Sequence, residues 1–395
     1  MSILDEAFTL KKYMVEQRNF FHAHPELGLQ EFNTCKHIEE ELDKIGLPHR
    51  RVAGTNVIAE IEGAGGAGAG AGAGKTLFLR ADIDALPIQE ENEVIYKSQN
   101  DGVMHACGHD GHAAYLLGAA KLIKTHAEAG DWNGKVILCF QAAEEIGKGA
   151  RDVIAAGELD KVDRIFGIHF QAGMDVGKYG IKAGPDMASC DRFKILIKGK
   201  AAHITTPQNG ADSVFIGALI TTQLQTLVSR LVSPVEGALI GVGSFHSGTT
   251  YNIIPGEALL EGTIRAFSAA NRTKLWEAVK KVATDVAETY GAKAEVDIED
   301  ICDPCNNPAE TAAEVVESAK KIVSIENVLT AIDKRFGSDN FADYMRKAPG
   351  TYVHVGSSAG ESTRYPHHNE RFDLAPDCLP YAAALAVQYT LDYLK

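Results

Sequence analysis

Four short segments of the chain carry side chains that could bind metal ions or move protons. The segment MHACGHDGH places Cys107, His109, Asp110 and His112 within six residues, at a predicted junction between a loop and a helix. Thiolate and neutral imidazole are good ligands for zinc-like metals, and residues two apart in a turn can face one centre. Considered alone, the segment is equally compatible with polar loop histidines and a core cysteine.

The other three segments are distant in sequence. The adjacent carboxylates Glu144 and Glu145 follow the apolar run KVILCFQ, His169 closes the run RIFGIHF, and His367-His368 lies in YPHHNERFD. Adjacent carboxylates repel each other, and the pair is tolerable when one binds a metal and the other holds a proton. A solvated loop or a core histidine is the alternative for each segment by itself.

Their positions relative to the predicted strands favour a shared site. Asp82, the glutamate pair and His169 each lie at or just after the end of an apolar strand. In an open α/β sheet, ligands bind beyond the carboxyl ends of the strands. The coincidence predicts a metal site at that edge of the sheet.

Apolar runs that alternate with helical patterns predict the sheet itself. We expect strands at 56–62, 76–82, 135–141, 164–170 and 351–356, and a helix from Asp110 to about residue 126. Near-continuous apolar strands between helices are typical of a largely parallel, buried sheet. The opening residues 1–21 predict one amphipathic helix, and residues 31–45 predict a second.

Residues 63–74 read GAGGAGAGAGAG, a run that cannot pack a core. The run predicts a flexible hairpin loop between the strands at 56–62 and 76–82. A silk-like sheet is the alternative.

The pattern changes near Gly184. The order of strands and helices that follows is β-α-β-β-α-β, which is that of a ferredoxin-like unit. We expect this unit to be an insertion at 186–300. The remaining residues, 1–185 and 301–395, are then one discontinuous domain.

Bulk properties exclude several classes of protein. The formal charge of −14 argues against a nucleic-acid partner, because such affinity is built from Lys and Arg. Seven scattered cysteines do not form a secreted disulfide framework, and no uninterrupted apolar run reaches the ~18 residues of a membrane span. The first residues lack a signal-peptide pattern. We therefore expect a cytoplasmic protein with no membrane partner.

Longer motifs resemble the aminoacylase and carboxypeptidase superfamily of paired-metal peptidases. The match is closest to its amidohydrolase branch, which includes hippurate hydrolases, auxin-conjugate hydrolases and N-acetyl-diaminopimelate deacetylases. The motifs run nearly from end to end: HPELG, RADIDALPIQE, MHACGHDGHAA, QAAEEIGKGA, GIHF, GKAAH, NIIPGEALLEGTIRAF and HHNERFD. The resemblance implies an α/β/α catalytic domain with an inserted ferredoxin-like lid or dimerisation domain.

The resemblance also implies a role for each site residue. The metal ligands would be Cys107, His109, Glu145, His169 and His368. Glu144 would be the catalytic base, and Asp82 would orient a ligand. His203 would polarise the scissile carbonyl from the partner subunit of a homodimer or higher oligomer, and Asn252 and Arg265 would contact the substrate carboxylate. His368 is chosen over His367 because it begins the His-x-x-x-Phe ending.

The activity implied is hydrolysis of the amide bond of N-acyl amino acids or small conjugates, with two divalent metals (zinc, manganese, nickel or cobalt). A dipeptidase or carboxypeptidase and a non-catalytic metal-binding homologue are the alternatives. The lone C-x-x-C at Cys302 and Cys305 could be a redox or structural-zinc module, or a tight loop. Three departures from the family pattern concern Ala142-Ala143 before the glutamates, ITTPQNG after His203, and Asn340 in place of a carboxylate.

Overall fold

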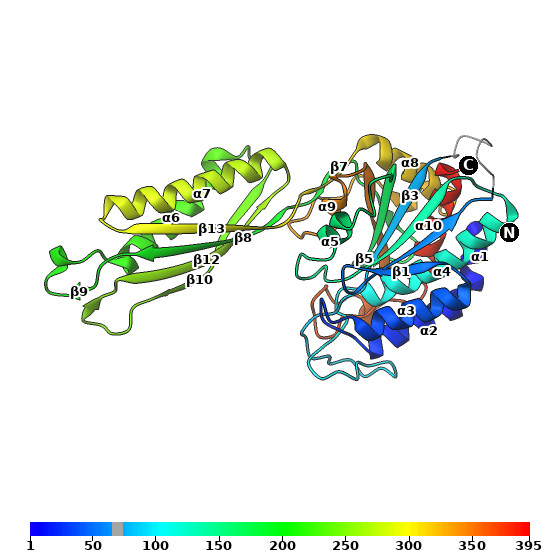
Figure 1. Ribbon diagram of the computed structural model, residues 1–395, viewed down its shortest axis with the longest axis horizontal. Coiled ribbons are helices and arrows are strands. Elements are labelled where there is room, and N and C mark those ends of the chain that lie inside the picture. The colour runs from blue at the N-terminus through cyan, green and yellow to red at the C-terminus, as the bar shows by residue number, and fades with distance from the viewer. Residues whose placement is uncertain (65–73) are drawn as a thin grey trace. The chain divides into compact units, whose positions relative to one another are not determined.

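The computed structural model describes residues 1–64 and 74–395, and these form two compact units (Figure 1). The larger unit comprises residues 1–184, 307–333 and 339–395. The smaller unit comprises residues 185–306 and 334–338. Residues 65–73 of the predicted Gly/Ala hairpin loop lie outside the described residues.

The larger unit is built on an eight-stranded sheet with the order β1-β2-β4-β3-β5-β16-β6-β15. The central strands β4, β3, β5 and β16 run parallel, whereas β2 pairs antiparallel with β4 and β1 antiparallel with β2. The strands are β1 (His49–Val52), β2 (Asn56–Glu62), β3 (Thr76–Asp82), β4 (Lys135–Gln141), β5 (Arg164–Asp175), β6 (Tyr179–Gly180), β15 (Val328–Leu329) and β16 (Gly350–Ser358).

Helices cover both faces of this sheet. Alternate residues of β3, such as Leu77 and Leu79, join the core shared with α1, α2, α3, α4, α8 and α10, because successive strand side chains point to opposite faces. On the other face, Phe78 packs against Tyr344 of α9 with ring centroids 5.2 Å apart. The α/β/α prediction is confirmed. The helices are α1 (Ile3–Thr9), α2 (Lys11–Ala23), α3 (Phe32–Ile45), α4 (His109–Ala129), α5 (Ala150–Ala155), α8 (Ala309–Ala319), α9 (Phe341–Tyr344) and α10 (Cys378–Tyr393).

Three local predictions were wrong. The opening helix is two helices, α1 and α2, separated by a turn at Leu10, because α1 packs on α10 whereas α2 packs on α4. The strands β2 and β3 are not hairpin partners, since β4 lies between them. Strand β5 does not end at residue 170, as predicted, but continues to Asp175, paired with β16. The pairing of β5 with β3 stops at Gly167, so His169 lies two residues beyond the end of the β3–β5 pairing.

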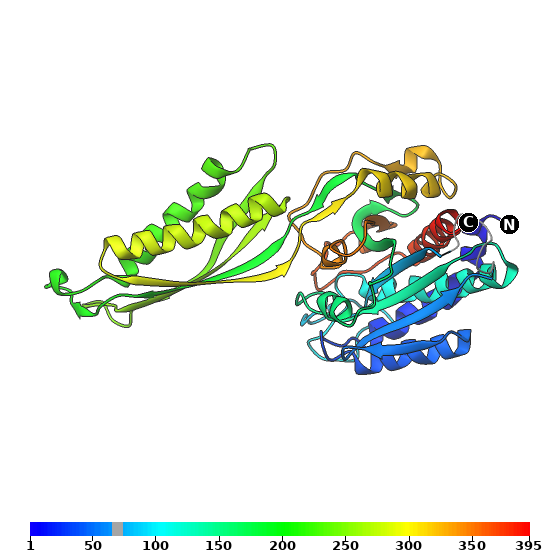
Figure 2. The same cartoon turned by 45° about the horizontal axis from the view of Figure 1, so that its top comes forward.

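The smaller unit is a four-stranded antiparallel sheet with the order β10-β12-β8-β13 and two helices (Figure 2). Apolar side chains alternate along β8, and the buried set, including Phe193 and Ile195, packs under α6 and α7. This topology matches the predicted ferredoxin-like order. The elements are β7 (Gly184–Met187), β8 (Cys190–Lys198), β9 (Ala202–His203), α6 (Ser213–Leu231), β10 (Ala238–Ser247), β11 (Ile253–Ile254), β12 (Glu257–Ala266), α7 (Ala269–Thr289), β13 (Lys293–Cys302) and β14 (Cys305–Asn307).

Helix α6 is the one helix of the described chain that is long and apolar enough to cross a membrane. In this structure its side chains Ile216, Ile220 and Leu224 are buried in the core of the smaller unit. These apolar side chains of α6 pack the helix on its own sheet.

Candidate metal centre

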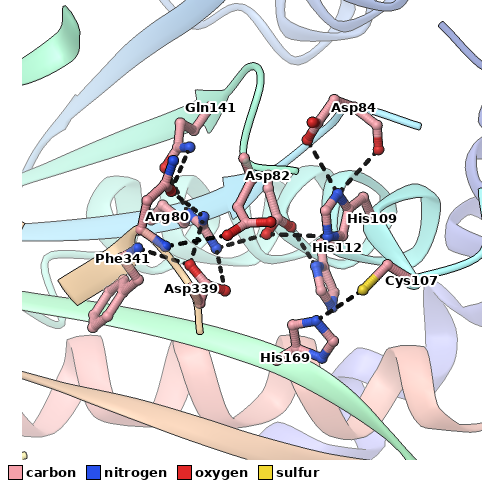
Figure 3. A network of polar contacts seen from close by, with 12 residues as sticks. Arg80, Asp82, Asp84, Cys107, His109, His112, Gln141, His169, Asp339 and Phe341 are labelled. Carbon is pink, nitrogen blue, oxygen red and sulfur yellow. Dashed lines mark hydrogen bonds and ion pairs between the residues drawn. The ribbon is translucent and has the colours of Figure 1, made fainter. Parts of the chain in front are cut away.

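Strand β3 ends in a buried cluster of charges. Arg80 donates hydrogen bonds to Gln141 at 2.9 Å, to Asp82 at 2.7 Å and to Asp339 at 2.9 Å (Figure 3). These four side chains are at most 3% exposed. The planar guanidinium has five N–H donors and can satisfy several acceptors at once. Arg80 thereby compensates the negative charge that accumulates where the strand ends.

Asp82 fixes the ring of His112. The Asp82 carboxylate lies 2.5 Å from His112 Nδ1, and the Phe170 N–H donates to His112 Nε2 at 2.9 Å. Because Nε2 accepts a hydrogen bond, the proton of the neutral ring is on Nδ1. Burial lowers the pKa of His112, which favours this neutral form. With both nitrogens engaged, His112 has no lone pair left for a metal.

His109 presents a lone pair at the first residue of α4. Its Nδ1 lies 3.0 Å from the carbonyl oxygen of Asp84 and 3.2 Å from the Asp84 carboxylate, so Nδ1 carries a proton. Its Nε2 is buried, has no hydrogen-bond partner and lies 3.4 Å from a carboxylate oxygen of Asp82. Burial opposes a charge on the ring, yet the Asp82 carboxylate and the hydrogen bonds to Asp84 raise the pKa of His109 well above its usual value. A cation at Nε2 is what this environment favours.

His169 and Cys107 face each other across the same space (Figure 3). The Nδ1 of His169 lies 2.7 Å from the carbonyl oxygen of Phe170 and donates to it, which leaves the lone pair on Nε2. That Nε2 lies 3.5 Å from Cys107 Sγ. Burial, helped by the nearby His112 and His367, lowers the pKa of His169 well below its usual value. Burial and the Glu145 carboxylate raise the pKa of Cys107 well above its usual value, so a thiolate here needs a cation beside it.

Glu145 joins the C-terminal histidine to this group. Its Oε1 is buried without a hydrogen-bond partner and lies 3.3 Å from His368 Nε2 and 3.9 Å from His109 Nε2. Burial raises the pKa of Glu145, but His368 and His109 outweigh that effect and lower it. His368 has a backbone φ of +64°, and its N–H donates to the Ala106 carbonyl at 2.7 Å. The left-handed backbone conformation of His368 directs its ring toward Glu145. This histidine was chosen in the sequence analysis only from the His-x-x-x-Phe pattern.

Glu144 has the properties of a proton carrier. Its carboxylate accepts a hydrogen bond of 3.1 Å from the backbone N–H of Asn340. Burial, together with the carboxylates of Asp339 and Glu145, raises the pKa of Glu144 well above its usual value. A carboxylate with a raised pKa is a stronger base.

The predicted ligands form two overlapping groups within the described residues. One group is Cys107, His109 and His169, the other is Cys107, Glu145 and His368, and within each the ligand atoms lie within 4.8 Å of one another. Sulfur, imidazole nitrogen and carboxylate oxygen are a donor set for zinc-like divalent metals. Two atoms of these groups, His109 Nε2 and Glu145 Oε1, are buried and have no hydrogen-bond partner. Because both atoms can donate an electron pair, a bound cation fits between them. None of these groups includes Cys302 or Cys305.

Asp84 is a candidate positioning residue that the sequence analysis missed. Its carboxylate contacts His109 Nδ1 at 3.2 Å and accepts the Glu145 N–H at 2.9 Å, so it orients two ligands. Asp82 was predicted to orient a ligand, but it lies on the Nε2 side of His109, where a metal would bind. The two aspartates are two residues apart in RADIDALP, and only the fold shows that the loop after β3 turns the second toward the ligands.

The smaller unit holds the remaining predicted residues in two places. His203 on β9 pairs with Ile253 of β11, next to Asn252, and the Asn252 carbonyl accepts the N–H of Ile204 at 3.1 Å. Arg265 lies near the other end of β12, where it donates to Thr263 Oγ1 at 2.7 Å. The β12–β8 ladder runs from Glu257 to Ile264, so the two places are roughly 20–25 Å apart at 3.4 Å per residue.

Comparisons with known proteins give a consistent result. Residues 78–392 match the model of peptidase family M20/M25/M40. The chain is 35% identical to thermostable carboxypeptidase 1 of Saccharolobus solfataricus over 96% of both chains. It is 38% identical to N-acetyl-L-cysteine deacetylase of Bacillus subtilis, covering 91% of this chain and 83% of the relative. The solved YXEP protein of Bacillus subtilis, a dinuclear metal binding peptidase from the M20 family, superposes with a TM-score of 0.83 at 33% identity, covering 98% of this chain and 99% of the other.

Proposed function

The chain belongs to peptidase family M20/M25/M40, and from this membership we propose a metal-dependent amidohydrolase that cleaves the amide bond of N-acyl amino acids. One observation carries the proposal. A lone pair on His109 and a carboxylate oxygen on Glu145 are buried 3.9 Å apart without hydrogen-bond partners, directly beside the raised-pKa carboxyl of Glu144. Cation ligands next to a base are what metal-assisted hydrolysis requires.

The two overlapping ligand groups would hold two divalent metals, with Cys107 common to both. Zinc, manganese, nickel and cobalt all suit this mixture of donors. When bound, such metals lower the pKa of the attacking water and polarise the scissile carbonyl. Asp84 contributes by holding His109 and the backbone of Glu145 in the ligating orientation.

Glu144 moves the proton in this mechanism. Its carboxylate takes a proton from the attacking water and gives it to the leaving amine nitrogen. The Asn340 N–H holds one oxygen of the carboxylate in place, and burial beside Asp339 makes the group more basic. The Asn340 side chain is held in turn by Arg80 and Gln141, which donate to its Oδ1 at 3.1 and 2.8 Å, and by the Lys148 carbonyl, which accepts from its Nδ2 at 2.7 Å.

His203 would stabilise the developing oxyanion. The Thr205 N–H donates to His203 Nδ1 at 3.3 Å, so the proton of the neutral ring is on Nε2, which can then donate to a carbonyl oxygen. Arg265 would pair with the free carboxylate of the amino acid. An N-acyl amino acid spans about 7 Å at 3.6 Å per residue, so one copy cannot place both His203 and Arg265 on one substrate. We therefore propose that His203, with its neighbour Asn252, acts from the partner subunit of a homodimer.

The dimer contact would use one side of the smaller unit. Strand β10 is an edge of its sheet, and exposed apolar side chains lie on β10 and the adjoining α6: Val214, Phe215, Leu239 and Phe245, each 37–46% exposed. A second copy of the chain can extend such an edge or cover such a face. We place the enzyme in the cytoplasm, because its seven cysteines are scattered along the sequence and do not follow the pattern of a secreted disulfide framework.

A carboxypeptidase is the second candidate, because the carboxypeptidase of Saccharolobus solfataricus is also 35% identical. The hydrolytic groups are the same in both activities, so the difference lies in the acyl side of the substrate.

Two measurements on purified protein test the proposal. Elemental analysis should find close to two divalent metals per subunit, and acetyl- and benzoyl-amino acids should be hydrolysed faster than dipeptides. Faster cleavage of dipeptides would favour the carboxypeptidase. Absence of both metal and hydrolysis after supply of zinc, manganese, cobalt or nickel would refute both candidates.

A further inference from the structure

The loop that carries Glu144 and Glu145 has an unfavourable backbone conformation at its start. Ala143, the residue before the pair, has a φ of +56°, a region that residues with a Cβ rarely adopt. Gly149 closes the same loop with a φ of +60°, and a Cβ there would lie 1.8 Å from the Ala142 carbonyl oxygen. Such a conformation persists only where surrounding groups hold it.

Two buried side chains hold the backbone N–H groups at this point. The Ala142 N–H donates to Asn56 Oδ1 at 2.9 Å, and the Ala143 N–H donates to Glu31 Oε1 at 2.8 Å. Asn56 and Glu31 are at most 1% exposed. Each contact comes from a part of the chain at least 86 residues away. The conformation before the glutamate pair is therefore set by tertiary contacts.

Glu31 is committed to this contact. It is the N-cap residue of α3, but its side chain accepts no hydrogen bond from the N–H groups of that helix. Its second oxygen, Oε2, instead accepts the Thr55 hydroxyl at 2.6 Å. Burial raises the pKa of Glu31, so holding this carboxylate inside the protein has a cost that its hydrogen bonds must offset.

The segment that precedes Glu31 braces the neighbouring ligand loop as well. The Ala85 N–H donates to the Glu26 carbonyl at 2.8 Å, immediately after Asp84. Gly28 packs so closely on the loop that an added Cβ would lie 3.2 Å from Ala143 Cα. Residues 26–31, which include the end of the HPELG motif, therefore contact both the loop of Asp84 and the loop of Glu144.

We propose that Glu31 is a positioning residue for the hydrolytic reaction. It touches neither substrate nor metal; through Ala143 it fixes the direction in which the chain enters Glu144 and Glu145. The inference rests on the proposed roles of those two residues as base and ligand. Since a displacement of about 1 Å can lower a rate by ~100-fold, losing this contact should affect turnover and metal affinity more than substrate binding.

Three variants test the assignment. Glu31→Ala removes the contact. Glu31→Gln keeps an oxygen that can accept the Ala143 N–H, and its NH2 group can donate a hydrogen bond to the Thr55 hydroxyl oxygen. Glu41→Ala is the matched control, because Glu41 is another buried carboxylate of α3, only 4% exposed, that binds the Tyr13 hydroxyl away from the loop. The measurements are kcat and KM for an N-acyl amino acid, metal affinity by chelator competition, and urea unfolding.

We expect Glu31→Ala to lower kcat by about 10- to 100-fold, with KM changed less than about threefold, and to weaken metal affinity by about tenfold. Glu31→Gln and Glu41→Ala should stay within about threefold of wild type in kcat, since each keeps the contact. Equal kcat and metal affinity in Glu31→Ala and Glu41→Ala would overturn the proposal, whatever their stabilities.

If Glu31→Ala does not fold, Thr55→Val and Thr55→Ser make the same comparison, because only serine keeps the hydroxyl that donates to Glu31. A lower kcat in Thr55→Val than in Thr55→Ser supports the proposal. Equal kcat values in the two variants refute it. If wild type hydrolyses no substrate, the proposed function fails separately. The metal affinities of Glu31→Ala and Glu41→Ala then decide the role of Glu31.

Discussion

The loops at the carboxyl ends of β3 and β4 differ from the smaller unit in how they hold functional side chains. In the first region every candidate residue has a defined partner, such as Asp84 for His109 or Asn340 for Glu144. Strand β3 is buried along its whole length, whereas β12 alternates between buried and partly exposed residues. Buried parallel strands end together and gather side chains, whereas a half-exposed antiparallel sheet spreads them over its surface.

The difference in burial has a chemical consequence. In the first region, burial and close charges raise the pKa of Glu144 and lower that of His169. In the second region, His203 is exposed and has contacts within its own loop. The side chains of the first region are thus held by buried contacts, whereas the ring of the exposed His203 has hydrogen bonds only to Thr205. The predictions below test this contrast.

The largest effect is expected for Glu144→Gln. The amide oxygen can still accept the Asn340 N–H, so the loop and the bound metals should be kept, but the proton acceptor is lost. We expect kcat to fall by about a thousandfold or more with metal content unchanged. A variant within tenfold of wild type would show that another group is the base.

His203→Ala should lower kcat by about 100-fold, because one oxyanion donor is lost. Mixing it with Glu144→Gln tests the supply of His203 by a partner. Random exchange of subunits makes half of the dimers mixed, each with one intact site, so activity should recover to roughly a quarter of wild type. If the mixture stays as inactive as its parents, each site uses its own His203.

Asp84→Asn should weaken metal affinity by about 10- to 100-fold, since an amide cannot accept from both the His109 ring and the Glu145 N–H. The comparison is Asp300→Asn in the smaller unit, where the carboxylate accepts from Arg272 at 2.5 Å. That change should lower the free energy of unfolding and leave metal affinity as it was. Equal losses of metal affinity in both variants would remove the contrast between the regions.

The smallest effect concerns pH. Burial and Arg18 oppose a charge on His22, but the carboxylates of Asp110 and Glu90, at 2.7 and 3.1 Å, outweigh them and raise its pKa. A raised folded pKa gives stability that is complete below the unfolded value of about 6.5 and is lost as pH rises through the folded pKa.

Urea unfolding between pH 6 and 9 should therefore show wild type losing stability relative to His22→Gln, with a slope of at most about 1.4 kcal/mol per pH unit for one proton. Parallel stability curves for the two proteins would mean that His22 binds its proton equally in the folded and unfolded states, so that folding does not raise its pKa.

Much of the fold was predictable because it follows from local pattern. Strands β2, β3 and β4 have the predicted bounds, since continuous apolar runs must be buried wherever they lie. The helix α4 begins one residue before the predicted start, and the smaller unit keeps the predicted order. The predicted end of strand β5 at residue 170 was wrong, because pairing with β16 extends the strand to Asp175 through residues that are only partly buried or exposed.

The sequence by itself determined which chemical groups this protein possesses and near which strand ends they occur, because side-chain type and apolar period are local properties. The tertiary structure decided which of two aspartates contacts both His109 Nδ1 and the Glu145 N–H, which ring nitrogen of His109 has no hydrogen-bond partner, and that Glu31 contacts a turn more than a hundred residues later. These depend on distances and directions between segments remote in sequence, and hydrogen bonds are sensitive to both.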